Sequence, residues 1–268
     1  MEASGSGGTP CGTLLDDGSA RRGGARSLAA SGECDAAAAG FRAQTVPCRL
    51  TLVNCSSDGE FLEEWRGLVD RVLVIPDQGS QTRFTPVRLF DCEYTYWQDN
   101  DMEPGRRCIE HFLEFARRAG DFSVLGQLGR KWPERGSYEA VEIPREAGPV
   151  AVDFIVRAYF LRTRNLHWME AFRWHAGYRM PIQDCDLLVS MALQFHTGWP
   201  CLLTPQNDDA ETLVNREELP APHAVCGDWQ RHIDRRTEFV RRGIAAGWTP
   251  VCEAESAPTT SPCPSAGG

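Results

Sequence analysis

Two short Cys/His pairs are the residues of this chain whose types and spacing suit metal chemistry. Cys108 and His111 are three residues apart, as are His223 and Cys226. A thiolate and an imidazole from each pair would make the tetrahedral ligand set that zinc prefers, if the fold brings the pairs together. The alternative is a cysteine buried in a helix core and a loop histidine, because free cysteines are among the most often buried residues. The sequence contains no CxxC, which is the most specific zinc signal.

A charged helix near the C-terminus is the second candidate for chemistry. Residues 228–246 predict an amphipathic helix: at 100° per residue, Trp229, Ile233, Val240 and Ile244 share one side, and Arg231, Arg235 and Arg242 share the other. Guanidinium groups in a row can pair with carboxylates or phosphates through two hydrogen bonds each. The arginine side is therefore either a binding surface or an ordinary solvated face.

The remaining elements are predicted from hydrophobic periodicity. Residues 150–160 and 166–174 alternate apolar and polar side chains around the polar segment Thr163-Arg164-Asn165, which predicts an antiparallel hairpin. Residues 50–53 and 72–75 predict short strands, and 108–119 predicts a helix with apolar residues on one stripe. Residues 187–195 fit a buried strand or a buried helix equally well. Residues 205–222 predict a polar loop.

Composition limits the architecture. A chain of 268 residues with 42% hydrophobic residues can bury one good core. We predict an α+β fold: a single domain over residues 46–252, with a largely antiparallel sheet and flanking helices. Residues 1–45 and 253–268 are rich in small and polar residues and predict disordered tails.

Charge and hydropathy limit the partners. No apolar run reaches the ~18 residues of a membrane-spanning helix, so no membrane partner is expected. The net charge of −9 argues against a general nucleic-acid binder, because phosphate neutralisation supplies most non-specific affinity. We therefore expect no direct sequence-specific nucleic-acid binding.

Several separate segments resemble one known family in the same order along the chain. The segment from Phe160 through Arg162, Arg164 and Trp168 to Gly177 resembles the central segment of the adenoviral early region 4 34-kilodalton protein family. The segments around Pro104-Gly105, Cys108-Ile109, Ile143–Glu146 and Arg235–Thr237 resemble further family elements. Family members often carry adjacent Cys and His ligands before the Pro-Gly element; the matching place here reads Tyr96-Trp97-Gln98-Asp99-Asn100-Asp101, which weakens a metal site carried over from the family.

The resemblance implies a non-enzymatic viral early regulatory adaptor in the host nucleus. It implies binding to a large viral early region 1B protein, recruitment of host cullin–elongin ligase subunits, and promotion of late viral mRNA export. The implied partner-binding and nuclear-localisation residues are Arg231, Arg235, Arg236, Arg241 and Arg242. No cysteine of this chain has leucine four residues before it, as an elongin-binding box requires. The alternative function is an enzyme with an unrecognised, possibly zinc-dependent site, since a site is defined by geometry.

Overall fold

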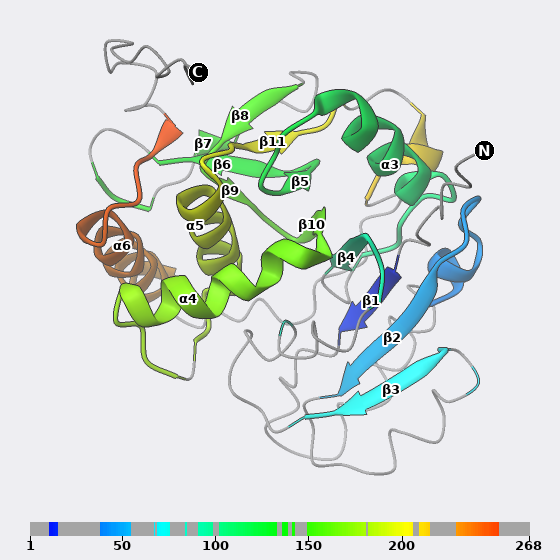
Figure 1. Ribbon diagram of the computed structural model, residues 1–268, viewed down its shortest axis with the longest axis horizontal. Helices are drawn as coiled ribbons and strands as arrows, with labels where there is room; N and C mark the ends of the chain where they lie inside the picture. The colour runs from blue at the N-terminus through cyan, green and yellow to red at the C-terminus, as the bar shows by residue number, and fades with distance from the viewer. Residues whose placement is uncertain are drawn as a thin grey trace, which may run out of the picture.

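A mixed sheet forms the centre of the computed structural model (Figure 1). The structure describes residues 11–15, 38–54, 67, 69–75, 84, 91–98, 102–132, 136–138, 141–142, 149–180, 182–205, 209–214 and 229–251. The eight strands of the main sheet follow the order β3-β2-β1-β4-β10-β5-β11-β8. A second sheet has three strands in the order β7-β6-β9.

Four parallel strands form one half of the main sheet. They are β1 (Cys11–Leu15), β2 (Arg49–Asn54), β3 (Arg71–Val74) and β4 (Tyr94–Gln98). From β1 the chain moves outward to β2 and β3, and then returns to place β4 on the other side of β1. In Figure 1 the arrowheads of β1, β2 and β3 all point to the lower left. The direction of the connections therefore reverses between β1 and β4.

The other half of the sheet mixes directions. β10 (Ala158–Arg162) lies antiparallel to β4, and β5 (Leu125–Gly126) lies antiparallel to β10. β11 (Cys201–Leu203) is parallel to β5, and the edge strand β8 (Val150–Val152) is antiparallel to β11. β5 and β11 therefore run in the same direction as β4. The small sheet consists of β6 (Gly129–Lys131), β7 (Val141–Glu142) and β9 (Phe154–Ile155).

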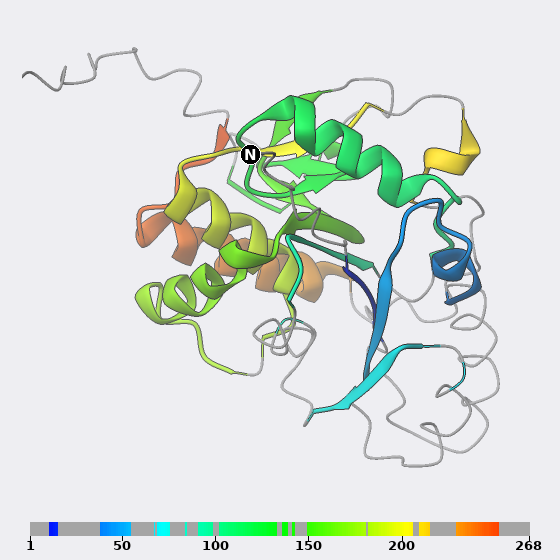
Figure 2. The same cartoon turned by 45° about the vertical axis from the view of Figure 1, so that its right-hand side comes forward.

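Helices cover both faces of the sheet, so its central strands are buried on both sides. α3 (Cys108–Ala119) lies on one side, and α4 (His167–His175), α5 (Cys185–Thr197) and α6 (Trp229–Ala245) lie on the other (Figure 2). Tyr96 and Phe160 point toward α3, where the rings of Phe112 and Phe160 stack with centroids 5.3 Å apart. Their neighbours in the two strands, Trp97 and Tyr159, belong to the opposite core.

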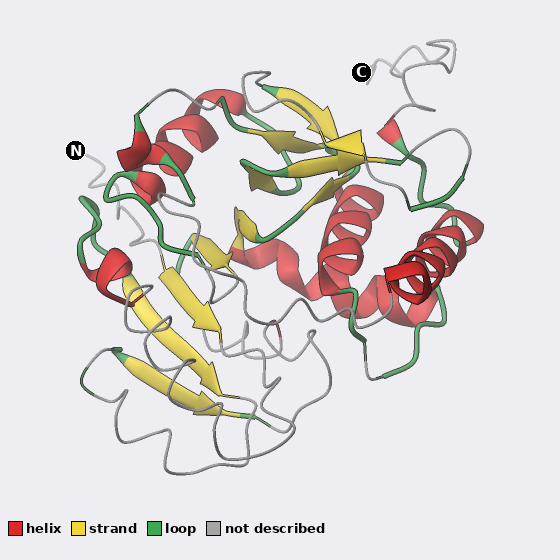
Figure 3. Cartoon of the chain, turned by 180° about the vertical axis from the view of Figure 1, so that it is seen from behind, coloured by secondary structure: helices red, strands yellow, loops and turns green. Residues whose placement is uncertain are grey.

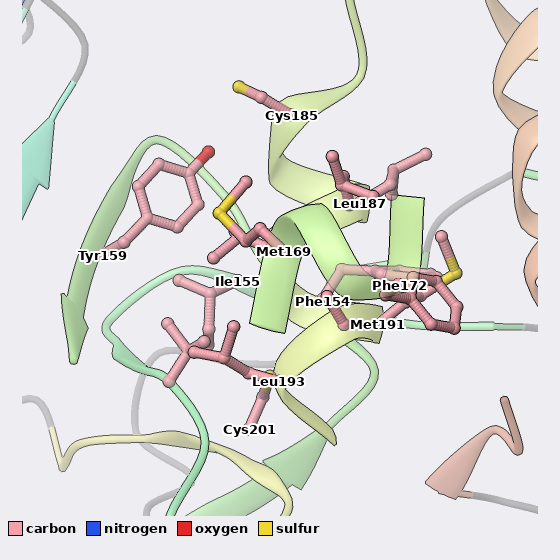
Figure 4. Packing of buried hydrophobic residues seen from close by; sticks show 14 of the residues in the cluster. Phe154, Ile155, Tyr159, Met169, Phe172, Cys185, Leu187, Met191, Leu193 and Cys201 are labelled. Carbon is pink, nitrogen blue, oxygen red and sulfur yellow. The ribbon is translucent and has the colours of Figure 1, made fainter. Parts of the chain in front are cut away.

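The core under α4 and α5 is filled by large apolar side chains. Figure 4 shows Tyr159 and Ile155 beside Met169 of α4 and Leu193 of α5. These side chains are at most 2% exposed. α5 is buried all round, with nine consecutive buried residues from Cys185 to Leu193, because it lies between the sheet and the other two helices. Residues 187–195, whose periodicity did not separate strand from helix, are thus helical.

The predicted hairpin is wrong in its second half. Its first run contains β8, β9 and β10, but the expected turn is a 3-10 helix, η2 (Thr163–Leu166), and the second run is α4. Leu166, Met169 and Phe172 are at most 2% exposed, whereas Trp174 is 72% exposed. Spacing of three residues between buried side chains is helical. The alternating pattern had placed Trp174 on the buried face.

The α+β fold class is confirmed, but the sheet is mixed and not largely antiparallel. Strands predicted at 50–53 and 72–75 correspond to β2 and β3, and the helices predicted at 108–119 and 228–246 correspond to α3 and α6. Within the predicted N-terminal tail, β1 and a short helix at Ala38–Arg42 are described. The domain limits otherwise stay a prediction. None of the helices in the described ranges is long and apolar enough to cross a membrane.

Candidate functional site

The carboxyl ends of β1 and β4 define the candidate site. In parallel sheets of this kind, ligands bind outside the carboxyl ends of the strands at the point where the connections reverse. Here that point lies between β1 and β4, which are neighbours in register from Cys11–Thr95 to Thr13–Trp97. We call the carboxyl ends of β1 and β4, together with the loops beyond them, the carboxyl edge.

A buried hydrogen-bond clamp closes the chain just beyond β4. The Tyr96 hydroxyl donates to Gln98 Oε1 at 2.9 Å, and Gln98 Nε2 donates to the Met102 carbonyl at 2.7 Å. All three residues are at most 1% exposed. The three residues between Gln98 and Met102 are Asp99, Asn100 and Asp101; they lie outside the described residues. The clamp therefore fixes both ends of a connection that carries two carboxylates.

The start of α5 belongs to the same edge. α3 connects β4 to β5, and α5 leads through residues 198–200 into β11. β11 runs parallel to β4, so it begins at the edge opposite the carboxyl edge. α5 ends where β11 begins, and its start therefore lies toward the carboxyl edge. The N-terminus of α5 carries Asp184 and Asp186.

Two arginines of α6 hold these two carboxylates. Arg235 donates to both oxygens of Asp184, from Nη2 at 3.0 Å and from Nε at 3.1 Å. Arg236 lies 3.5 Å from Asp184 and donates a short hydrogen bond to Asp186. The side chains of Asp184 and Arg236 are only 3% and 10% exposed. Charges this deeply buried are stable only when they are paired.

Tyr138 completes this group, which we call the α5–α6 ion cluster: Tyr138, Asp184, Asp186, Arg235 and Arg236. The Arg236 guanidinium lies 4.3 Å from the centre of the Tyr138 ring. Burial alone would lower the pKa of Arg236, but the neighbouring Asp186, Tyr138 and Asp184 raise it above its usual value. Arg236 is therefore permanently charged, and the cluster links α6 to the start of α5. Figure 3 shows these helices together on one side of the sheet.

The predicted arginine surface is largely engaged within the molecule. Arg235 and Arg236 belong to the ion cluster, Arg241 donates to the Gly136 carbonyl at 3.0 Å, and Arg242 lies 3.9 Å from Glu238. Arg231, Arg235, Arg241 and Arg242 are exposed, whereas Arg236 is buried. The buried Arg236 is thus held away from any external partner; binding through the other four stays a prediction.

The proposed zinc ligands fall in different surroundings. Cys108 is fully buried in the core beside Phe112, and burial raises the pKa of its thiol well above its usual value. His111 is half-buried, with Nε2 3.0 Å from the Pro205 carbonyl, and burial lowers the pKa of His111. His223 and Cys226 lie outside the described residues. Among the residues that the structure does describe, no three His, Cys, Asp or Glu side chains form a metal cluster. The zinc site stays a prediction.

Sequence reasoning missed the residues that define this edge. Asp99 and Asp101 were named only because they stand where the resembling family has metal ligands. What distinguishes them is their place directly after β4, and periodicity did not predict that strand. Asp184 and Asp186 flank Cys185 at the start of a predicted buried segment. An acidic pair before an apolar run is a helix-start signal, and it would have identified α5 as a helix.

Comparison with known proteins gives a distant structural likeness. No family model matches the chain, and no curated protein matches it. A crystal structure of S. aureus TarS matches with a TM-score of 0.48 and 12% identity over 74% of this chain and 35% of TarS. A structure of TarS 1-349 in complex with UDP-GlcNAc matches with the same TM-score and identity, over 56% of that chain. The chain thus spans about a third to a half of the chains it matches.

One earlier prediction is corrected by these comparisons. The sequence predicted a non-enzymatic adaptor. That prediction is contradicted, because the structural neighbours are structures of a glycosyltransferase. The likeness gives this chain neither an activity nor a substrate. The adenoviral resemblance, the viral and host partners and the nuclear localisation are untested and stay predictions.

Proposed function

We propose that the chain is an enzyme that binds a nucleoside diphosphate donor with a divalent cation at the carboxyl edge and transfers the group that the donor carries. One observation carries this proposal: the parallel order β3-β2-β1-β4 reverses its connections at β4, and β4 is followed directly by Asp99-Asn100-Asp101. Parallel strands in this order bind nucleotides at that reversal. The residues found there decide which chemistry the site can perform.

The donor atoms fit a hard divalent cation. Two carboxylates separated by one residue supply oxygen ligands, and Mg²⁺ is held in nucleotide sites by one or two carboxylates together with the phosphates of the substrate. A bound cation would neutralise negative charge that develops on the diphosphate as the bond to the transferred group breaks. The role of the chain is to hold Asp99 and Asp101 at the end of β4, and the Tyr96–Gln98–Met102 clamp fixes both ends of their connection.

Asp184 has a supporting role in this proposal. Two guanidinium groups lie 3.0 and 3.5 Å from one of its oxygens, and its side chain is 3% exposed. A carboxylate whose charge is already paired in this way is not free to take a proton from an acceptor. The α5–α6 ion cluster therefore holds the start of α5 in place and leaves the chemistry to other residues.

Titration calorimetry tests the proposal directly. UDP, ADP, GDP and UDP-GlcNAc, the ligand in one of the TarS structures, are titrated into the protein with Mg²⁺ or with a chelator. We expect at least one to bind, with a cation requirement, and Asp99→Asn with Asp101→Asn to weaken binding about tenfold or more, the cost of losing a charged contact. Asp121→Asn, an exposed aspartate beyond the far end of α3, is the matched control and should change nothing.

Two results would contradict this function. One is the absence of binding for every nucleotide by protein that melts cooperatively. The other is binding that is unaffected by both the chelator and the double variant.

A further inference from the structure

The connection between β9 and β10 contains a strained turn at Arg157. Arg157 has φ of 66°, and no other non-glycine residue in the described ranges has a positive φ. The Ala158 amide donates to the Val156 carbonyl at 2.8 Å. A hydrogen bond that spans two residues around a positive φ is a γ-turn of the rare, strained kind. Arginine is not among the residues that adopt this conformation easily, which are Gly, Asn and Asp.

The surroundings hold this turn from both sides. The Val156 amide donates to the Leu128 carbonyl at 3.0 Å, and Ala158 begins β10. Gly126 of β5 lies so close that an added Cβ would be 3.2 Å from the Ala158 carbonyl oxygen and would overlap Ile155. The packing therefore requires the turn, but it does not require an arginine at its tip, where glycine would fit without strain. Strain of this kind is characteristic of functional positions.

The turn lies at the carboxyl edge. Ala158 pairs with Gln98, the last residue of β4, so Arg157 is next to the strand end that Asp99 follows. Arg157 is exposed. In the described part of the chain its guanidinium has no carboxylate, carbonyl or ring partner, in contrast to Arg130, Arg162, Arg173 and Arg236, which contact aromatic rings. An unpaired guanidinium at this edge of the sheet has the charge and geometry to bind phosphate oxygens.

We infer that Arg157 binds a phosphate group of the donor. The inference rests on the proposed function and adds a phosphate ligand to it. The turn holds the backbone of Arg157 at the carboxyl edge, and a planar guanidinium can make two hydrogen bonds to one phosphate.

Three variants separate charge from backbone strain. Arg157→Gln removes the charge and keeps the side-chain length, whereas Arg157→Gly removes both the charge and the strain. Arg117→Gln, on the exposed surface near the far end of α3, is the matched control for loss of one charge. Calorimetry with Mg²⁺ is carried out with inorganic pyrophosphate, with the tightest-binding nucleoside diphosphate of the panel and with the matching nucleoside. Melting is followed by circular dichroism.

The expected result has two parts. Both Arg157 variants should bind pyrophosphate and the nucleoside diphosphate about tenfold or more weakly, the loss expected for a charge-assisted contact, with unchanged affinity for the nucleoside. Arg157→Gly should melt at a higher temperature than the wild type, since it relieves the strain, so a weaker affinity cannot come from unfolding. Arg117→Gln should match the wild type in both measurements.

The outcomes distinguish this inference from the proposed function. If the wild type binds nucleoside diphosphates and both Arg157 variants bind them equally well, the proposed function stands and the Arg157 inference fails. An equal loss of affinity for the nucleoside would also overturn it, because the effect would then not be on phosphate. If the wild type binds no phosphate compound, both the function and the inference fail.

Discussion

The α5–α6 ion cluster predicts a large and specific loss of stability when Arg236 is replaced. Arg236→Met keeps the length of the side chain and removes its charge. The variant leaves Asp186, whose side chain is 13% exposed, without a partner. Asp184, whose side chain is 3% exposed, keeps only Arg235. Removing one partner of a buried ion pair costs about 3–5 kcal/mol. Because Arg235 still holds Asp184, we expect the lower end, about 3 kcal/mol, and a drop in melting temperature of roughly 6–12 °C.

The same substitution elsewhere on α6 provides the control. Arg242 is 47% exposed and lies 3.9 Å from Glu238, so Arg242→Met should cost less than about 1 kcal/mol. Urea unfolding of the two variants measures both costs. Adding Asp186→Leu to Arg236→Met should restore most of the lost stability, because it removes the unpaired charge. If Arg236→Met and Arg242→Met cost the same, or the double variant is no better than Arg236→Met, the cluster is not a stabilising ion network.

Two further predictions concern histidine and zinc. Burial, with smaller contributions from His175 and His167, lowers the pKa of His196 below 6.5; the unfolded chain therefore binds the proton more readily, so stability is full above pH 6.5 and falls below it. Between pH 7.5 and 5.5, His196→Gln should lose less unfolding free energy than the wild type, by about the contribution of one titrating group. Equal slopes of unfolding free energy against pH for the two proteins would refute this. If Cys108, His111, His223 and Cys226 hold zinc, untagged protein contains about one equivalent, Cys226→Ser releases it, and a chelator lowers the melting temperature. Folded protein without zinc would exclude that site.

Helices with one apolar stripe were predictable, whereas the sheet order was not. In α3, Cys108, Phe112 and Ala116 repeat every four residues and are buried, so the helix was found with its limits. β4 offers no such pattern, because every residue of Tyr94–Gln98 is buried, on both faces of the strand. Periodicity reports one exposed face and one buried face. A strand between two helical layers has no exposed face, so β4 could not be derived from periodicity.

The wrong hairpin has the same physical origin. Residues 166–174 contain apolar side chains at spacings that satisfy both a strand and a helix, since Leu166 and Phe172 fit either period. Met169 decides between them: it is 2% exposed and would lie on the solvent face of a strand. The large ring of Trp174 favoured a place on the buried face, but Trp174 is 72% exposed. Hydrophobicity alone cannot show that Arg173, with its guanidinium 4.3 Å from that ring, covers one face of it.

Three parts of the chain that are far apart in sequence meet at the carboxyl edge. β4 leads into Asp99 and Asp101, the γ-turn presents Arg157, and the start of α5 presents Asp184. Each is unremarkable as sequence: two aspartates around an asparagine, one arginine among many, and an aspartate before a helix. Their arrangement depends on strand direction, because β10 must run against β4 for Arg157 to lie next to the end of β4, and α5 must end where β11 begins for its start to lie toward the same edge. Reversal of one strand would separate the proposed cation ligands from the proposed phosphate ligand. The mixed direction of the sheet, which the sequence did not predict, is therefore what allows one edge to hold both kinds of charge.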